Sequence, residues 1–223
     1  MSTYYYTLVA SLPALPLHFD SWPIPVTAAT LRSRLSMLDD PHRNTVQQLS
    51  DFFRWDRQPR DHSDADVIAK QRRLGIEIRN PLVARLVRHR FEMRTLVAAV
   101  RSKRAGDSVP ELPDFPLSAA IRRHWDQPYF GLNVRYSWLV RFCQALDDHQ
   151  PSQAQRHLFA ELWDHWRRID QLYHFSFESI VLYLARWEIL SRWASQNTEL
   201  GKQRFDGLVD SILRKEGAAL LSL

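Results

Sequence analysis

Apolar side chains recur every three or four residues through most of this chain, and that spacing is the period of one face of an α-helix. The most regular row has intervals of four, three, four, three and four residues, and only His89 interrupts its apolar character. Pro81 and Gly106 flank the row, and these residue types favour the first turn and the end of a helix. We therefore expect one long helix between them. The row consists of Leu82, Leu86, His89, Met93, Leu96 and Val100.

Comparable rows predict helices along the rest of the chain, so the expected fold class is all-α, an irregular multi-helix bundle. Eight tryptophans among 223 residues indicate an aromatic-rich core. Segment 177–193 is apolar on nearly every side, and we expect it at the centre of the bundle. Other helices are expected at 27–39, 40–53, 117–125, 134–146, 151–173 and 198–217, with a loop at 55–64.

The N-terminal segment has a different composition. Tyr4, Tyr5 and Tyr6 stand in a row, and Pro13 follows them. Tyrosine is enriched in strands and proline breaks helices. We therefore expect a short extended segment over residues 4–13, either a strand or a buried coil.

One boundary between domains is expected, at residues 106–115. This segment contains two prolines and three charged residues, a composition typical of loops and linkers. It divides the chain into an N-terminal helical half, 1–105, which contains the long helix, and a C-terminal helical half, 106–223. The alternative is one continuous domain.

Positive charge is concentrated in the segment 72–104. Ten arginines and lysines stand there against two glutamates, a local charge of +8 in a chain whose formal charge is +5. Such a segment favours an anionic partner, which could be nucleic acid, phospholipid headgroups or an acidic protein surface. A solvated face without a ligand is the alternative. The candidate contact residues, which lie off the apolar row, are Arg85, Arg88, Arg94 and Arg101.

Residues for catalysis or cofactor binding are not evident in the sequence. It contains no GxSxG, Walker, GxGxxG, HExxH or CxxC motif, and we expect neither an enzyme nor a bound cofactor. The thiol of Cys143 lies within an apolar stripe and is expected to be buried and inert.

Three residues could face one another on a helix as metal ligands. His157, Glu161 and His165 are spaced by four residues, but nothing else supports a metal site, and a solvated helix face is the preferred interpretation. His89, within its apolar row, is interpreted as a core histidine with one satisfied nitrogen rather than a pH switch.

The single cysteine and the absence of a positively charged signal region at the N-terminus favour a cytoplasmic location. No stretch of the sequence is long and apolar enough to predict a membrane span. Any contact with a membrane is therefore expected to occur through a partner.

Three segments resemble one bacterial protein family. The first is Tyr-Tyr-Tyr-Thr-Leu-Val-Ala-Ser-Leu-Pro at 4–13, and the second is Ile-Arg-Asn at 78–80, followed by the basic helix. The third is the helical segment 177–193, continued by Gly201 and Phe205. The family has no assigned function, and its genes lie beside those of V/A-type ATPase subunits.

The resemblance implies a non-catalytic role equivalent to that of the archaeal-type C subunit, whose eukaryotic counterpart is the d subunit. Proteins of this kind are all-helical, sit on the membrane rotor ring and receive the base of the central stalk. The expected partners are therefore stalk and ring subunits, with no small-molecule substrate and a location peripheral to the inner membrane. The four arginines, together with Tyr4, Tyr5 and Tyr6, are expected to contact these partners. An ATPase assembly factor and a nucleic-acid-binding helical protein remain the alternatives.

Overall fold

The computed structural model describes residues 4–21, 23–53 and 78–196, together with Asp66, Ala69 and Arg73. The expected loop at 55–64 and the expected last helix at 198–217 lie outside the continuous part of this description, as do Gly201 and Phe205.

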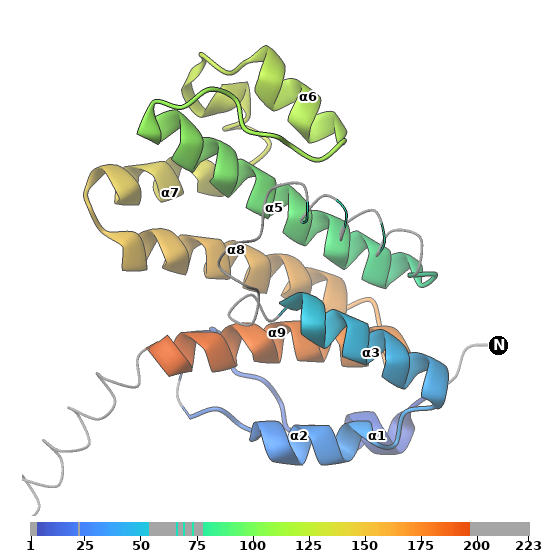
Figure 1. The fold of residues 1–223 in the computed structure, drawn as a ribbon. Helices are drawn as coiled ribbons and strands as arrows, with labels where there is room; N and C mark the ends of the chain where they lie inside the picture. The colour runs from blue at the N-terminus through green and yellow to red at the C-terminus, as the bar shows by residue number, and fades with distance from the viewer. Residues whose placement is uncertain are drawn as a thin grey trace, which may run out of the picture.

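The described residues form an all-α fold, as the sequence predicted (Figure 1). One 3₁₀ turn, η2 (Pro128–Gly131), joins two of the helices. The α-helices are α1 (Tyr6–Ser11), α2 (Ala28–Leu35), α3 (Asp40–Phe53), α5 (Pro81–Ala105), α6 (Pro116–Arg123), α7 (Trp138–Asp147), α8 (Pro151–Asp170) and α9 (Phe177–Gln196).

The helices α8 and α9 form the middle of the bundle. Helices α7, α8 and α9 pack in chain order, and α5 lies across them on the side of α8 (Figure 1). Helix α3 packs on α9, while α1 and α2 lie together on the far side of α9 from α5. Helix α6 covers the C-terminal end of α5.

Local sequence signals fix both ends of α5. The side-chain oxygen of Asn80 accepts hydrogen bonds from two backbone N–H groups of the first turn, at 3.0 and 3.1 Å, and Pro81 occupies the first helical position. Gly106 ends the helix at φ 78°, a left-handed conformation that glycine adopts without steric cost. The amide nitrogen of Asn80 also donates to Glu178 at 2.7 Å, which ties the start of α5 to the start of α9.

The aromatic core predicted from the tryptophan content is present. Trp163 and Trp166 on α8 are almost completely buried, and α9 is buried along most of its length, as expected. A single cluster of buried apolar side chains includes residues from both sides of residue 106. Within segment 106–115, Leu112 is buried and accepts a hydrogen bond from Arg122 through its carbonyl oxygen.

The N-terminal segment is not extended as the sequence suggested. Residues Tyr6–Ser11 form α1, and the extended pairing found there is one antiparallel bridge between Tyr4 and Ser176. Leu8 within the helix and Tyr5, the residue just before it, are both buried. Burial of these side chains outweighs the strand propensity of the tyrosines.

The predicted start of the next helix, at residue 134, is also wrong. Val134 is 90% exposed and precedes α7, which begins at Trp138. The chain enters α7 from a turn in which Tyr129, Phe130 and Gly131 all have positive φ. Residues 132–137 separate this turn from α7, and Val134 lies within a further turn at 133–135.

Candidate functional site

The four arginines predicted to form one contact surface lie on two sides of α5. Because successive helical residues are separated by about 100°, Arg85 and Arg88 are about 60° apart on one side. Arg94 lies about 180° from Arg85, and Arg101 lies close to Arg94 in orientation. Arg85, Arg88 and Arg101 are exposed, whereas Arg94 is half-buried. The single arginine surface of the sequence interpretation is therefore corrected to two surfaces.

The side with Arg85 and Arg88 continues onto α8. His165 of α8 is half-buried, and burial is the main cause that lowers its pKa. Arg168 and Arg85 lower that pKa further by charge repulsion, so both guanidinium groups lie near the imidazole. Arg168 is exposed, as are the two arginines of α5. We call Arg85, Arg88 and Arg168 the basic face.

Other basic residues of α5 stabilise the fold. The Lys103 ammonium donates to the backbone carbonyl oxygens of Trp125 and Gln127 and so holds the turn before α7. Arg104 forms an ion pair with Asp147 of α7. The local charge of +8 therefore overstates the charge that α5 presents to a partner.

Two arginines are buried against tryptophan rings, and the sequence interpretation missed both roles. The Cζ atom of Arg90 lies 5.7 Å from the ring centre of Trp166, and that of Arg186 lies 4.9 Å from the ring centre of Trp163. Burial lowers the pKa of both guanidinium groups. One sequence feature could have indicated a buried arginine, namely the charge of Arg186 within the apolar segment 177–193.

The three weak metal-ligand candidates lie on α8, and the structure changes the interpretation of their surroundings. Among the described residues, no group of three or more potential ligands is arranged to hold an ion. His157, Glu161 and His165 are half-buried rather than on a solvated face. The ring of His165 instead stacks on that of His89, with ring centres 4.0 Å apart.

His89 and Cys143 are both inside the bundle to a large extent. Burial, with repulsion from His165 and Arg90, lowers the pKa of His89 to about 3, and the His89 Nδ1 atom is buried without a hydrogen-bond partner in the described structure. Burial and the nearby Asp147 raise the pKa of the Cys143 thiol. The thiol therefore stays protonated near neutral pH and is a poor nucleophile.

The three tyrosines at the N-terminus have different environments. Tyr5 is buried, and its hydroxyl lies 2.7 Å from His42 Nδ1 in a hydrogen bond. Tyr4 and Tyr6 are 58% and 59% exposed, and their rings stack with centres 5.6 Å apart. Tyr6 also packs against Phe175, which is partly exposed, at 5.1 Å. We call Tyr4, Tyr6 and Phe175 the aromatic patch.

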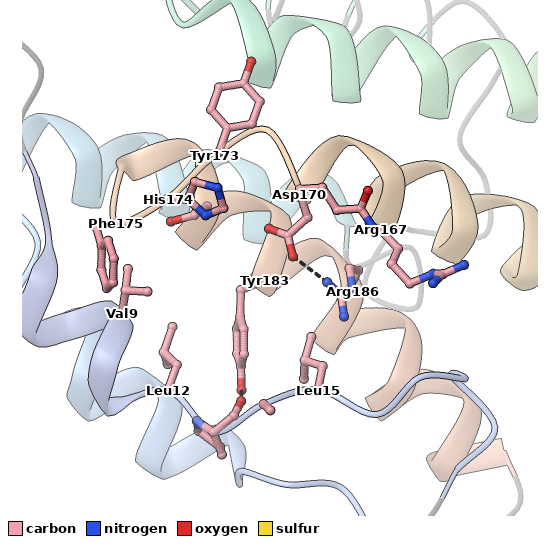
Figure 2. Close-up of a pocket in the computed structure, with 14 residues that line it drawn as sticks. Val9, Leu12, Leu15, Arg167, Asp170, Tyr173, His174, Phe175, Tyr183 and Arg186 are labelled. Carbon is pink, nitrogen blue, oxygen red and sulfur yellow. Dashed lines mark hydrogen bonds and ion pairs between the residues drawn. The ribbon is translucent and has the colours of Figure 1, made fainter.

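A pocket of about 460 Å³ adjoins the aromatic patch and shares Phe175 with it. Segment 9–15 forms one wall, and the end of α8, the turn 171–175 and α9 form the other (Figure 2). The Tyr183 hydroxyl crosses the pocket and donates to the carbonyl oxygen of Pro13 at 3.0 Å. Behind it, Arg186 pairs with Asp170 at 2.6 Å. Nothing in the helical periodicity indicated this pocket, because its walls come from opposite ends of the chain.

Neither the basic face nor the pocket contains an arrangement typical of nucleophilic or metal-assisted catalysis. Within the part of the chain that the structure describes, no helix combines the length and the apolar character that crossing a membrane requires. Comparisons with protein-family models, curated proteins and solved structures gave no match to this chain.

Proposed function

We propose that this protein is a non-catalytic component of a bacterial V/A-type ATPase, a coupling element between the central stalk and the membrane rotor ring that is similar to the archaeal-type C subunit. The choice of this complex rests on the resemblance of segments 4–13, 78–80 and 177–193 to the ATPase-associated family. The structural observation that carries the proposal is the basic face, which two packed helices hold in place.

The basic face suits an acidic protein partner. Arg85 and Arg88 come from α5 and Arg168 comes from α8, and all three side chains are exposed. Exposed charges of one sign on a rigid support steer an oppositely charged surface and fix its orientation. The base of a central stalk with acidic residues would be such a surface.

The packing of the helices suits a part that transmits rotation. The tryptophans of α8 lie in one continuous core with α5 and α9, and cores of this kind are close-packed and resist compression. The aromatic patch lies on α1 and the turn before α9, and it offers a second contact of apolar character. Exposed aromatic clusters of this type are enriched at protein interfaces.

The nucleic-acid alternative receives less support from the described residues. Binding to single strands usually relies on exposed aromatic rings on which bases stack. Trp138, Trp163 and Trp166 are buried, and the described tryptophans at 125, 187 and 193 are half-buried. The Nε1 atom of Trp187, moreover, donates to the carbonyl oxygen of Val26 within the fold.

The first experiment is purification of the tagged full-length protein from native membranes in mild detergent, followed by mass spectrometry of the co-purifying chains. We expect the catalytic and stalk subunits in a fixed ratio to the tagged protein. An assembly factor would instead be substoichiometric or missing from the complete complex. Recovery of nucleic acid, or of the protein alone from the soluble fraction, would overturn the proposal.

A further inference from the structure

The pocket beside the aromatic patch has the properties of a ligand-binding site. Its volume of about 460 Å³ falls within the range of about 300 to 1,000 Å³ that is typical of small-molecule sites. We propose that it binds a small amphipathic anion, a carboxylate or phosphate monoester with a short apolar group. This inference does not depend on the ATPase proposal.

One part of the pocket is apolar and would accommodate the hydrocarbon group. Val9 and Phe175 lie on one side of Tyr183, and Leu12 and Leu15 lie beside the lower part of its ring (Figure 2). Phe175 is 41% exposed and meets Tyr6 at the mouth. An apolar ligand group would cover this surface and remove it from water.

The other part of the pocket is cationic and would hold the anionic group. Arg167 and Arg186 both line it, and their charges repel each other, because Arg167 lowers the pKa of Arg186. Asp170 is the acidic residue among the lining side chains, and Arg186 already pairs with it. Arg167 has no carboxylate partner in the lining, because its long ion pair is with Asp164 outside the pocket, and a bound anion would compete with that pair for the Arg167 charge.

Hydrogen-bond donors also exceed acceptors at this end. The Nε atoms of Arg167 and Arg186 are both buried without a partner among the described residues. Arg167 has a weak ion pair with Asp164 at 3.5 Å through another of its nitrogen atoms. A buried donor without an acceptor destabilises the fold. A bound anion would supply an acceptor if either guanidinium group moved toward it, and the free-energy cost of the unpaired donor would then fall.

The position of the charged end strengthens the expected interaction. Burial raises the pKa of Asp170 and lowers that of Arg186, so water screens both groups poorly. Charge attraction is stronger in such surroundings than at an open surface. His174 lies near Asp170 on the same wall of the pocket.

The test is isothermal titration of the full-length protein with octanoate and with octyl phosphate. We expect saturable binding of one or both at a single site. Acetate and inorganic phosphate, which lack the apolar group, should bind at least about tenfold more weakly. Octylamine, which carries the opposite charge, should not bind. Binding of octylamine as tightly as octanoate would overturn the proposal, because it would indicate apolar partition alone.

Two pairs of variants locate the site. Arg167→Gln removes a lining charge, and Arg168→Gln makes the same change at the neighbouring exposed residue of the basic face. We expect at least about tenfold weaker octanoate binding for the first variant only. Leu12→Asn changes the apolar wall, whereas Leu17→Asn changes an exposed leucine, 62% accessible, that is not part of the lining. Only the former should weaken binding.

The same variants distinguish the ligand-site proposal from the ATPase proposal. Absence of saturable binding, or equal losses in Arg167→Gln and Arg168→Gln, would overturn the ligand site, provided that circular dichroism shows the variants folded. Stalk association is expected to respond to Arg168→Gln rather than to Arg167→Gln. The two proposals can therefore fail independently.

Discussion

At the scale of single residues, buried polar side chains distinguish this molecule from a simple apolar bundle. The His89 and His165 rings stack between α5 and α8, and positive charges surround them. Burial is the main cause that lowers the pKa of both imidazoles, and charge repulsion adds to it, from His165 and Arg90 at His89 and from Arg168 and Arg85 at His165. Both imidazoles are therefore held neutral, and their packing depends on remaining so.

The His89 environment predicts acid sensitivity. In the folded protein its pKa is lowered to about 3 from an ordinary value of 6.5, so the unfolded chain takes up a proton first as the pH falls. The stabilisation is present above pH 6.5 and is lost progressively below it. Between pH 7 and pH 5, the lowered pKa of His89 decreases the free energy of unfolding by about 2 kcal/mol.

Urea unfolding at several pH values measures this effect. The His89→Leu variant should lose less stability between pH 7 and pH 5 than the unmodified protein does. The exposed His18 provides the control, and His18→Gln should keep the original pH dependence. An unchanged slope in His89→Leu would show that other groups cause the acid sensitivity.

The Arg186–Asp170 pair predicts a strong single-site effect. Asp170→Asn leaves a buried guanidinium without its carboxylate, which costs about 3 kcal/mol of unfolding free energy. The double variant Asp170→Asn with Arg186→Met should be less destabilised than the sum of the two single changes. The exposed pair Arg156–Asp20, at 2.7 Å, is the control, and Asp20→Asn should cost at most about 1 kcal/mol. Additive effects at Asp170 and Arg186 would contradict this account.

At the scale of elements, α5 serves the core and the surface at once. Its apolar row is buried, apart from His89, which is half-buried. The same helix carries exposed arginines on two sides, and its ends are set by Asn80 and Gly106. The Asn80 side chain also reaches Glu178 of α9, so one residue determines both where α5 begins and how it meets a neighbouring helix.

Substitutions at Asn80 should separate these two roles. Asn80→Ala removes the cap and the bond to Glu178, and we expect a loss of about 1 to 3 kcal/mol in thermal or urea unfolding. Asn80→Ser keeps an oxygen for the cap but cannot reach Glu178 in the same way, so an intermediate loss is expected. If both variants were as stable as the unmodified chain, the cap would be irrelevant to the fold.

At the scale of the whole molecule, the basic face and the pocket share α8 but are otherwise built from different elements, and they predict separate behaviour. The basic face joins α5 and Arg168 of α8, whereas the pocket joins segment 9–15, the end of α8, the turn 171–175 and α9. Under the proposed function, an acidic partner binds the former. Its binding should weaken as salt is added, because the contacts are exposed charges.

Charge reversal tests which side of α5 contacts the stalk. Arg85→Glu with Arg88→Glu should reduce association with the stalk at least about tenfold without changing helicity. Arg101→Glu with Arg123→Glu makes the same change in net charge at exposed positions elsewhere and should have little effect. Pull-down and circular dichroism measure the two quantities. Equal losses in both double variants would show that net charge, rather than the basic face, controls association.

Sequence patterns alone predict most of the described helices, although not α1, because the signals for these helices are local. The apolar period, the cap at Asn80, the proline at 81 and the glycine at 106 act within a few residues of one another. The division of the arginines between two sides also follows from the helical period once α5 is known to be continuous.

Contacts between distant segments set the remaining side-chain environments, which local patterns do not predict. Within segment 4–13, residues Tyr6–Ser11 are helical, and burial of Leu8 and of the adjoining Tyr5 stabilises this arrangement. His89 met His165, and Arg186 met Asp170 and Trp163. The pocket required segment 9–15 to lie against the end of α8 and the start of α9. Burial, pKa and cavity shape are properties of such long-range packing, and no local pattern in a sequence records which helices will meet.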